Sequence, residues 1–98
     1  MLTLRVHSAS ERLTPGQLAR AILDQRCTAG RWLVVTVTYS GQAQIYVHRA
    51  PKAAMHRLGS LIRGKLRNWD AYASFAIAPR GEVYSQENIK TALRSGWL

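Results

Sequence analysis

Apolar and polar residues alternate at the start of the chain, where LTLRVH at 2–7 puts its leucines and its valine on one face. A period of two is that of a strand with one buried face, so this pattern predicts a first strand. The segment LTPGQL follows at 13–18 and combines Thr14 as an N-cap, a proline at the first helical position and Gln17 for a capping box. We therefore expect a first helix that ends near Arg26.

The next apolar region has the composition of a β-hairpin. RWLVVTVTY at 31–39 is rich in β-branched and aromatic residues, and QAQIYVHR at 42–49 follows after a Ser-Gly pair. A three-residue loop over 40–42 would set Val37 opposite Ile45 and give one apolar face, whereas a two-residue loop would mix polar and apolar groups on both faces. The pattern favours the three-residue loop. The opposite face would then carry Trp32, Val34, Thr36, Thr38, Gln44, Tyr46 and His48.

Residues 51–69 have the apolar stripe of a helix whose other side is basic. The stripe recurs at helical spacing from Ala54 to Trp69, and Pro51 suits the helix N-terminus. Gly59 and Gly64 are two internal weak points of this helix. The side opposite the stripe comprises positions 52, 56, 59, 60, 63 and 67.

The remainder of the chain predicts three short elements. AYASFAIAP at 71–79 is typical of a strand, 82–84 of a short extended piece, and Ser85 of the N-cap of a last helix. The whole order is β-α-β-β-α-β followed by a β-α addition.

Right-handed crossovers fold this order as a ferredoxin-like βαββαβ sandwich. We therefore predict a single α+β domain over 1–98, with a C-terminal short strand and helix. Its antiparallel sheet would have central first and third strands and would carry the helices on one face. The alternative is a β-hairpin packed on a looser helical cluster.

The composition and net charge of the chain limit the classes of partner that it can bind. The chain has 98 residues, 47% of them hydrophobic, which suits one domain. Its 14 Lys and Arg against 5 Asp and Glu give a net charge of +9, and 11 of the 14 are Arg. This charge favours a nucleic acid, a membrane surface or an acidic protein, and the Arg content favours phosphates and carboxylates. The single Cys27 and the lack of an export signal or a long apolar run predict a cytoplasmic protein without membrane contact.

The open sheet face is the first candidate surface. In the predicted fold it brings Arg5 and His7 beside Tyr46 and His48. This topology resembles that of the RNA-recognition motif, whose central-strand aromatics stack on bases. The resemblance is one of topology alone, because QAQIYVHR has one aromatic and no glycine where that family alternates them. The alternative is that the final hairpin and helix cover this face, or a second subunit does, and a homodimer is possible there.

The basic side of the second predicted helix is the other candidate surface. Lys52, His56, Arg63 and Arg67 share one exposed row, which we call the basic ridge, and have no acidic neighbours four residues away. Contact with four to six duplex phosphates would give a log–log salt slope of about −4 to −5. The alternative is a solvated helix face. The candidate residues for binding nucleic acid or an acidic partner are Arg49, Lys52, His56, Arg57, Arg63, Lys65, Arg67, Arg5, Tyr46 and His48.

The pattern of chemically reactive residues does not favour catalysis. The acidic residues are scattered, the histidines form no i,i+4 pair, and no base lies near Cys27 in the sequence. Acylphosphatases share the size, basic character and expected topology, but HSASERLTPG is not the glycine-rich phosphate loop that they need after the first strand. We therefore expect no enzyme activity, no catalytic residue, no metal and no cofactor.

Together these features predict a small non-catalytic module that binds DNA or RNA through the basic ridge and the open sheet face. The alternative is a protein-binding regulator or inhibitor of the kind that mobile elements encode. It would dock its basic face on an acidic or nucleic-acid-binding surface of a larger complex, with anchors such as Trp32 or Trp97.

Overall fold

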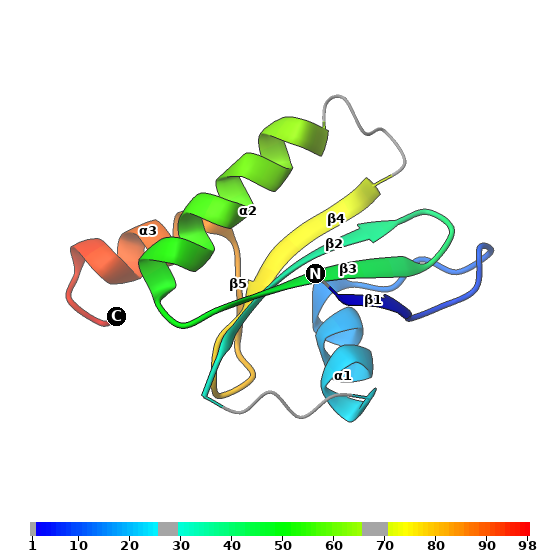
Figure 1. Cartoon of the computed structure of the whole chain (residues 1–98), viewed down its shortest axis with the longest axis horizontal. Helices are drawn as coiled ribbons and strands as arrows, with labels where there is room; N and C mark the ends of the chain where they lie inside the picture. Colours follow the sequence, from blue (N-terminus) through cyan, green and yellow to red (C-terminus); the bar gives the residue numbers. More distant parts are fainter. Residues whose placement is uncertain (1, 26–29, 66–70) are drawn as a thin grey trace.

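The structure is a computed structural model that describes residues 2–25, 30–65 and 71–98, with the backbone alone of Lys65. This part of the chain forms a five-stranded antiparallel sheet with three helices (Figure 1). The elements are β1 (Leu2–Arg5), α1 (Pro15–Gln25), β2 (Trp32–Thr38), β3 (Gln42–His48), α2 (Pro51–Lys65), β4 (Ala71–Ile77), β5 (Val83–Tyr84) and α3 (Gln86–Arg94). Each expected element is present, and the expected ends of the first helix near Arg26 and of the second at Trp69 lie outside the described residues.

The strand order is β1-β3-β2-β4-β5, and all neighbouring strands are antiparallel. The sequence predicts an α+β protein with an antiparallel sheet, and the structure has both features. The ferredoxin-like arrangement is not confirmed, because β1 lies at one edge of the sheet and the central strand is β2, between β3 and β4. The chain after β1 accounts for this placement, since the Val6 N–H donates to the Gly41 carbonyl at 2.8 Å and holds β1 against the β2–β3 turn.

The hairpin has a three-residue loop, but the loop is Tyr39-Ser40-Gly41. The register pairs Val35 with Ile45 and Val37 with Ala43, so the expected pairing of Val37 with Ile45 is wrong by two residues. Gly41 explains the difference, because its φ of 92° suits the left-handed last position of such a loop. A shift of two residues preserves the faces of a strand, so the predicted division into two faces still holds.

Helices cover both faces of the sheet (Figure 1). α1 packs on the face that carries Val35 and Val37, and α2 and α3 pack on the opposite face. The first core cluster is Leu18, Ala19, Ile22, Leu33, Val35, Val37, Ala43, Ile45, Phe75 and Ile77. The second is Trp32, Val34, Ala54, Leu58, Ala76, Ala78 and Ile89.

The sheet face that we expected to be open is therefore covered. Trp32 is 3% exposed and Val34 is 0% exposed, and both belong to the cluster built with α2 and α3. The expectation of helices on one face is wrong, because β2 is apolar on both sides and each side needs its own cover. On the same face, Thr3 and Arg5 of the edge strand β1 are exposed, and a homodimer through this face stays a prediction.

α3 approaches α2 closely at Gly59. Gly59 is buried, although the sequence pattern groups it with the exposed side of the helix. A Cβ at this position would meet the side-chain amide of Gln86, the first residue of α3. The glycine therefore marks where the two helices approach each other, which helical periodicity alone does not reveal.

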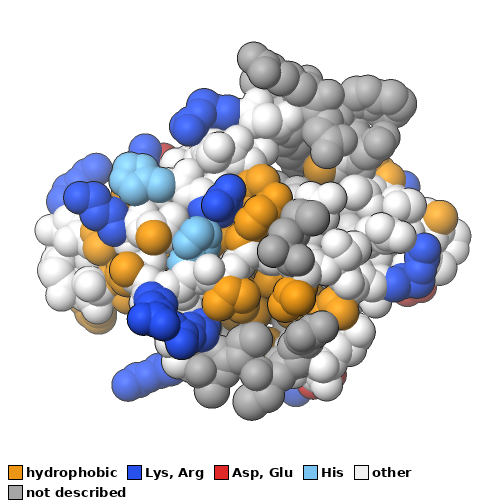
Figure 2. Space-filling view, in the orientation of Figure 1, with side chains coloured by type: hydrophobic (Ala, Val, Ile, Leu, Met, Phe, Trp, Pro, Cys, Tyr) orange, Lys and Arg blue, Asp and Glu red, His pale blue; other side chains and the backbone are white. Residues whose placement is uncertain are grey.

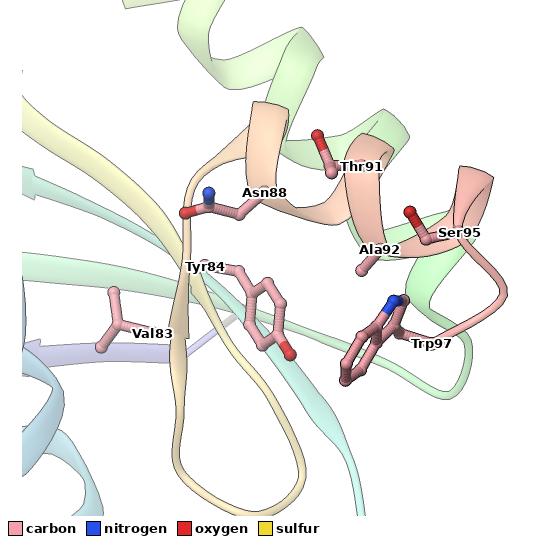
Figure 3. Close-up of a pocket in the computed structure, with 7 residues that line it drawn as sticks. All are labelled: Val83, Tyr84, Asn88, Thr91, Ala92, Ser95 and Trp97. Carbon is pink, nitrogen blue, oxygen red and sulfur yellow. The ribbon is translucent and has the colours of Figure 1, made fainter.

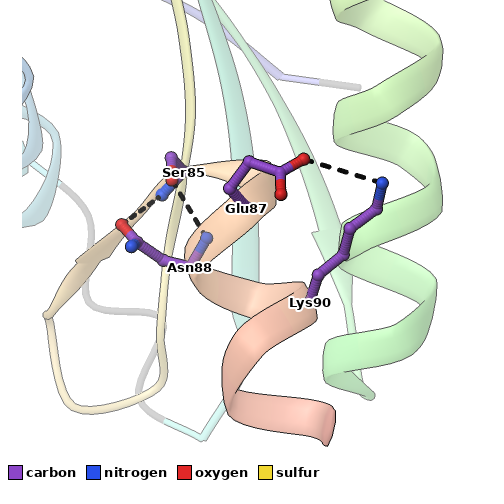
Figure 4. Close-up of polar contacts among 4 residues, drawn as sticks. All are labelled: Ser85, Glu87, Asn88 and Lys90. Atoms are coloured by element: carbon purple, nitrogen blue, oxygen red, sulfur yellow. Dashed lines mark hydrogen bonds and ion pairs between the residues drawn. The ribbon is translucent and has the colours of Figure 1, made fainter.

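α3 begins at a capping box that confirms Ser85 as its N-cap (Figure 4). The Asn88 N–H donates to Ser85 Oγ at 3.1 Å, and the Ser85 N–H donates to Asn88 Oδ1 at 3.3 Å. Glu87 lies in the first turn, where the helix dipole favours a negative charge. Among the helices described, none is long and apolar enough to cross a membrane.

Candidate nucleic-acid interface

Basic side chains gather on the exterior of α2. Lys52, His56 and Arg63 are exposed on its outer side, and Arg49 is exposed just before the helix. Figure 2 shows Lys, Arg and His side chains grouped on the side of the molecule that holds α2 and α3. Arg67 and the side chain of Lys65 lie outside the described residues, so the described part of the ridge consists of Lys52, His56 and Arg63.

Acidic groups do not neutralise this surface within residues 2–25, 30–65 and 71–98. The one ion pair there joins Lys90 Nζ to Glu87 Oε1 on α3, at 3.6 Å (Figure 4). Glu11 is engaged elsewhere, because its carboxylate accepts hydrogen bonds from the backbone N–H and the hydroxyl of Ser8. These two bonds lower the pKa of Glu11. The positive charge of the outer side of α2 therefore faces solvent.

Tyr46 lies against α2. The Arg57 guanidinium carbon is 4.6 Å from the centroid of the Tyr46 ring, which is a cation–π geometry. Arg57 thus occupies one face of the ring that we expected to stack on bases. The structure brings Tyr46 and Arg57 together, but as an internal contact between β3 and a helix.

His48 lies on the same face of β3 as Tyr46 and near Arg57. Burial lowers the pKa of His48, and the positive charge of Arg57 lowers it further. Its Nε2 atom is buried and has no hydrogen-bond partner among the described residues. Both effects disfavour the charged imidazolium, so His48 is a poorer phosphate ligand than its place in the sequence predicts.

Arg5 and His7 do not neighbour Tyr46 and His48. Arg5 pairs in register with Gln42, at the other end of β3, and its guanidinium donates to the Ser40 carbonyl at 3.1 Å. The prediction was wrong because the observed β1, although it pairs with β3, runs antiparallel to it with Leu2 opposite Ile45, so Arg5 lies away from Tyr46 and His48. In the observed sheet, β1 is an edge strand whose C-terminal end meets the hairpin turn.

His7 belongs to a cluster that the sequence pattern does not reveal. His7 is buried, and its Nε2 is 2.8 Å from the Tyr72 hydroxyl. The Arg12 guanidinium lies over the ring of Tyr39 at 4.6 Å and near that of Tyr72 at 5.6 Å. Arg12 also donates to the Tyr39 carbonyl at 3.2 Å. The irregular segment after β1 has no periodicity from which such a cluster could be predicted, and its contacts join β1 to the hairpin.

The two tryptophans considered as anchors differ in exposure. Trp32 is buried under α2 and α3 and cannot anchor a partner, whereas Trp97 is 84% exposed. Cys27 and Asp70 lie outside the described residues. Within the described ranges, no group of three His, Cys, Asp or Glu side chains could hold a metal ion.

Comparison with known proteins returns no match. No protein-family model, no curated protein and no solved structure resembles this chain significantly.

Proposed function

We propose that this chain is a small nucleic-acid-binding module that holds phosphates on the outer side of α2. The observation that carries the proposal is the row of exposed Lys52, His56 and Arg63, extended by Arg49, with no acidic partner among the described residues. Exposed cations that are not paired within the protein are available to phosphate oxygens.

The length of the row suits a nucleic-acid backbone. From Lys52 to Arg63 the helix rises by about 16 Å at 1.5 Å per residue. Successive phosphates of one strand advance by about 3.4 Å along a duplex, so a row of this length can meet several of them. Phosphate contacts carry no direct sequence information, and the proposal implies binding without sequence-specific readout through this row.

A pair of charge reversals tests the proposal. Arg63→Glu and Arg20→Glu change the net charge equally, but Arg63 lies on α2 and Arg20 is exposed on α1, across the sheet. We expect Arg63→Glu to weaken binding severalfold and to reduce the log–log salt slope by about 1. Fluorescence anisotropy of labelled single-stranded DNA, single-stranded RNA and duplex DNA at several salt concentrations measures both quantities.

Two results would contradict the proposal. One is the absence of binding to any of these nucleic acids at low salt. The other is an equal effect of Arg63→Glu and Arg20→Glu, which would mean that net charge matters and the surface of α2 does not.

A protein partner with an acidic surface is the second candidate, and the exposed side chain of Trp97 favours it. A large aromatic side chain beside a basic surface is typical of a binding hot spot between proteins. In that case the chain would act as a regulator or inhibitor of a larger complex. Weak binding to free nucleic acid together with loss of one dominant partner on Trp97→Ala would support this candidate over the first.

A further inference from the structure

An aromatic groove lies at the end of the sheet where β2 begins and β4 ends. Its volume is about 560 Å³, and its walls include the aromatic side chains of Trp32, Tyr84 and Trp97 and the prolines Pro51 and Pro79. The Trp32 and Tyr84 rings pack at a tilt, with centroids 5.3 Å apart. Since Trp32 is buried, it holds Tyr84 from the core side, and the groove has a firm aromatic base.

Trp97 forms the outer wall and is held by its backbone. Gly96 has a φ of 78°, and the Trp97 N–H donates to the Ala92 carbonyl at 2.8 Å, as in a Schellman motif at a helix C-terminus. Figure 3 shows the rings of Tyr84 and Trp97 projecting into the same space, and both line this groove and the adjoining hollow on α3. The backbone of Trp97 is therefore held at the end of α3, and 84% of that residue is exposed.

Cations border this groove. Arg80 lines it, and the exposed Arg49 and Lys52 lie within two positions of Pro51 in the chain. The lining itself holds one cation, Arg80, and one acidic residue, Glu82, so the excess of positive charge comes from Arg49 and Lys52 beside Pro51. The groove opens beside the N-terminal end of the basic ridge, because Pro51 and Lys52 begin α2. The groove therefore combines an aromatic surface with positive charge at its border.

We propose that this groove takes a nucleobase of a single-stranded nucleic acid, stacked on Trp97, while the neighbouring phosphates contact Arg80 and Lys52. An exposed base has a π face on which an indole stacks, and it is linked to an anionic backbone. A base in a duplex is stacked between its neighbours and cannot enter the groove, so the groove selects single strands. This inference rests on the proposed function and adds the class of nucleic acid to it.

The test separates stacking from charge. Two labelled single-stranded DNA oligomers of about 12 nucleotides are titrated by anisotropy, one of thymidines and one abasic with the same number of phosphates. We expect the thymidine oligomer to bind about tenfold more tightly than the abasic one. Trp97→Ala should remove this difference and leave the abasic affinity unchanged, whereas Trp97→Phe should retain part of it. The side chain of Trp97 is exposed, so neither variant is expected to unfold the chain.

A second readout locates the base. The indole N–H resonance of Trp97, assigned by its loss in Trp97→Phe, should shift with the thymidine oligomer and stay in place with the abasic one. Equal affinities of the two oligomers would contradict base binding in the groove and leave the proposed function intact. A preference for the thymidine oligomer that persists in Trp97→Ala would have the same meaning. No binding of either oligomer at low salt would also overturn the groove, and only a further absence of binding to single-stranded RNA and duplex DNA would overturn the proposed function itself. A shift of the indole resonance with a proline-rich peptide but not with thymidines would assign the groove to a protein ligand.

Discussion

His48 and Arg57 show at the scale of single residues how packing changes the chemistry of a side chain. His48 alternates with apolar residues on β3, and α2 brings Arg57 and its positive charge toward it. Burial and this charge both disfavour the imidazolium form, so the pKa of His48 lies below its ordinary value. The sequence pattern predicts His48 as a binding residue. The tertiary structure partly buries its ring beside Arg57 and so disfavours the charged form that would bind a phosphate.

We expect Arg57→Gln to raise the pKa of His48 without restoring its ordinary value, because burial is the larger cause of the shift. Titration of the His48 ring by NMR measures this directly. Arg63→Gln is the control, since it removes an arginine from the same helix but not the one whose charge acts on His48. A pKa of His48 that is unchanged in Arg57→Gln would contradict the role of Arg57.

The same shift has a consequence for stability. The unfolded chain binds a proton at His48 more readily than the folded chain does, so protonation favours unfolding. The stability that a neutral His48 provides is present above about pH 6.5 and is lost as the pH falls through its folded-state pKa. His48→Gln should therefore reduce the loss of stability on acidification, as urea unfolding at neutral and mildly acidic pH would show.

At the scale of elements, the attachment of β1 to the hairpin depends on one turn. Gly41 ends the loop between β2 and β3 with a positive φ, and its carbonyl accepts the Val6 N–H. A Cβ on Gly41 would meet the backbone carbonyl of His7. The turn therefore needs glycine both for its conformation and for the close approach of the segment after β1.

Gly41→Ala should reduce the free energy of unfolding by about 2–4 kcal/mol, from left-handed backbone strain together with displacement of the His7 backbone. Gly30→Ala is a matched control, because Gly30 has a φ of 82° but open space around its Cβ position. The control should lose about 1 kcal/mol from strain alone. Urea unfolding compares the two variants, and equal losses would show that the contact with His7 costs nothing.

At the scale of the whole molecule, most basic side chains have no acidic side chain paired with them among the described residues. The net charge is +9, and the ion pair between Glu87 and Lys90 is the one found within the described residues. Repulsion among cations on the outer side of α2 opposes folding and is screened by salt. Such a surface lowers the stability of the fold and at the same time attracts anions.

We expect the Tm to rise when sodium chloride is increased from about 0.02 to about 0.3 M, because added salt shortens the distance over which the cations repel one another. A relief of about 1 kcal/mol would correspond to about 4–8 °C in a domain of this size. The double variant Lys52→Glu/Arg63→Glu should show a smaller rise in circular dichroism melts. A Tm that is independent of salt in the wild-type chain would argue against repulsion on this surface.

The elements themselves could be predicted from local patterns. Alternation at 2–7, the capping signals at Thr14 and Ser85, and the apolar stripe of α2 each depend on residues close in the chain, and each predicted element is present in the structure. The exposure of Lys52, His56 and Arg63 follows from the same helical spacing. These properties are local because a strand or helix repeats over a few residues.

Tertiary structure alone decided which elements meet. The edge position of β1, the burial of Trp32 and Val34, the approach of α3 at Gly59 and the groove beneath Trp97 all depend on contacts between segments far apart in the chain. Because β2 has apolar residues on both sides, each side must pack against another element, but periodicity does not predict which helix packs on which side. The pattern of a single sequence thus determines the faces of its elements, and the partners of those faces are selected by packing of the whole chain.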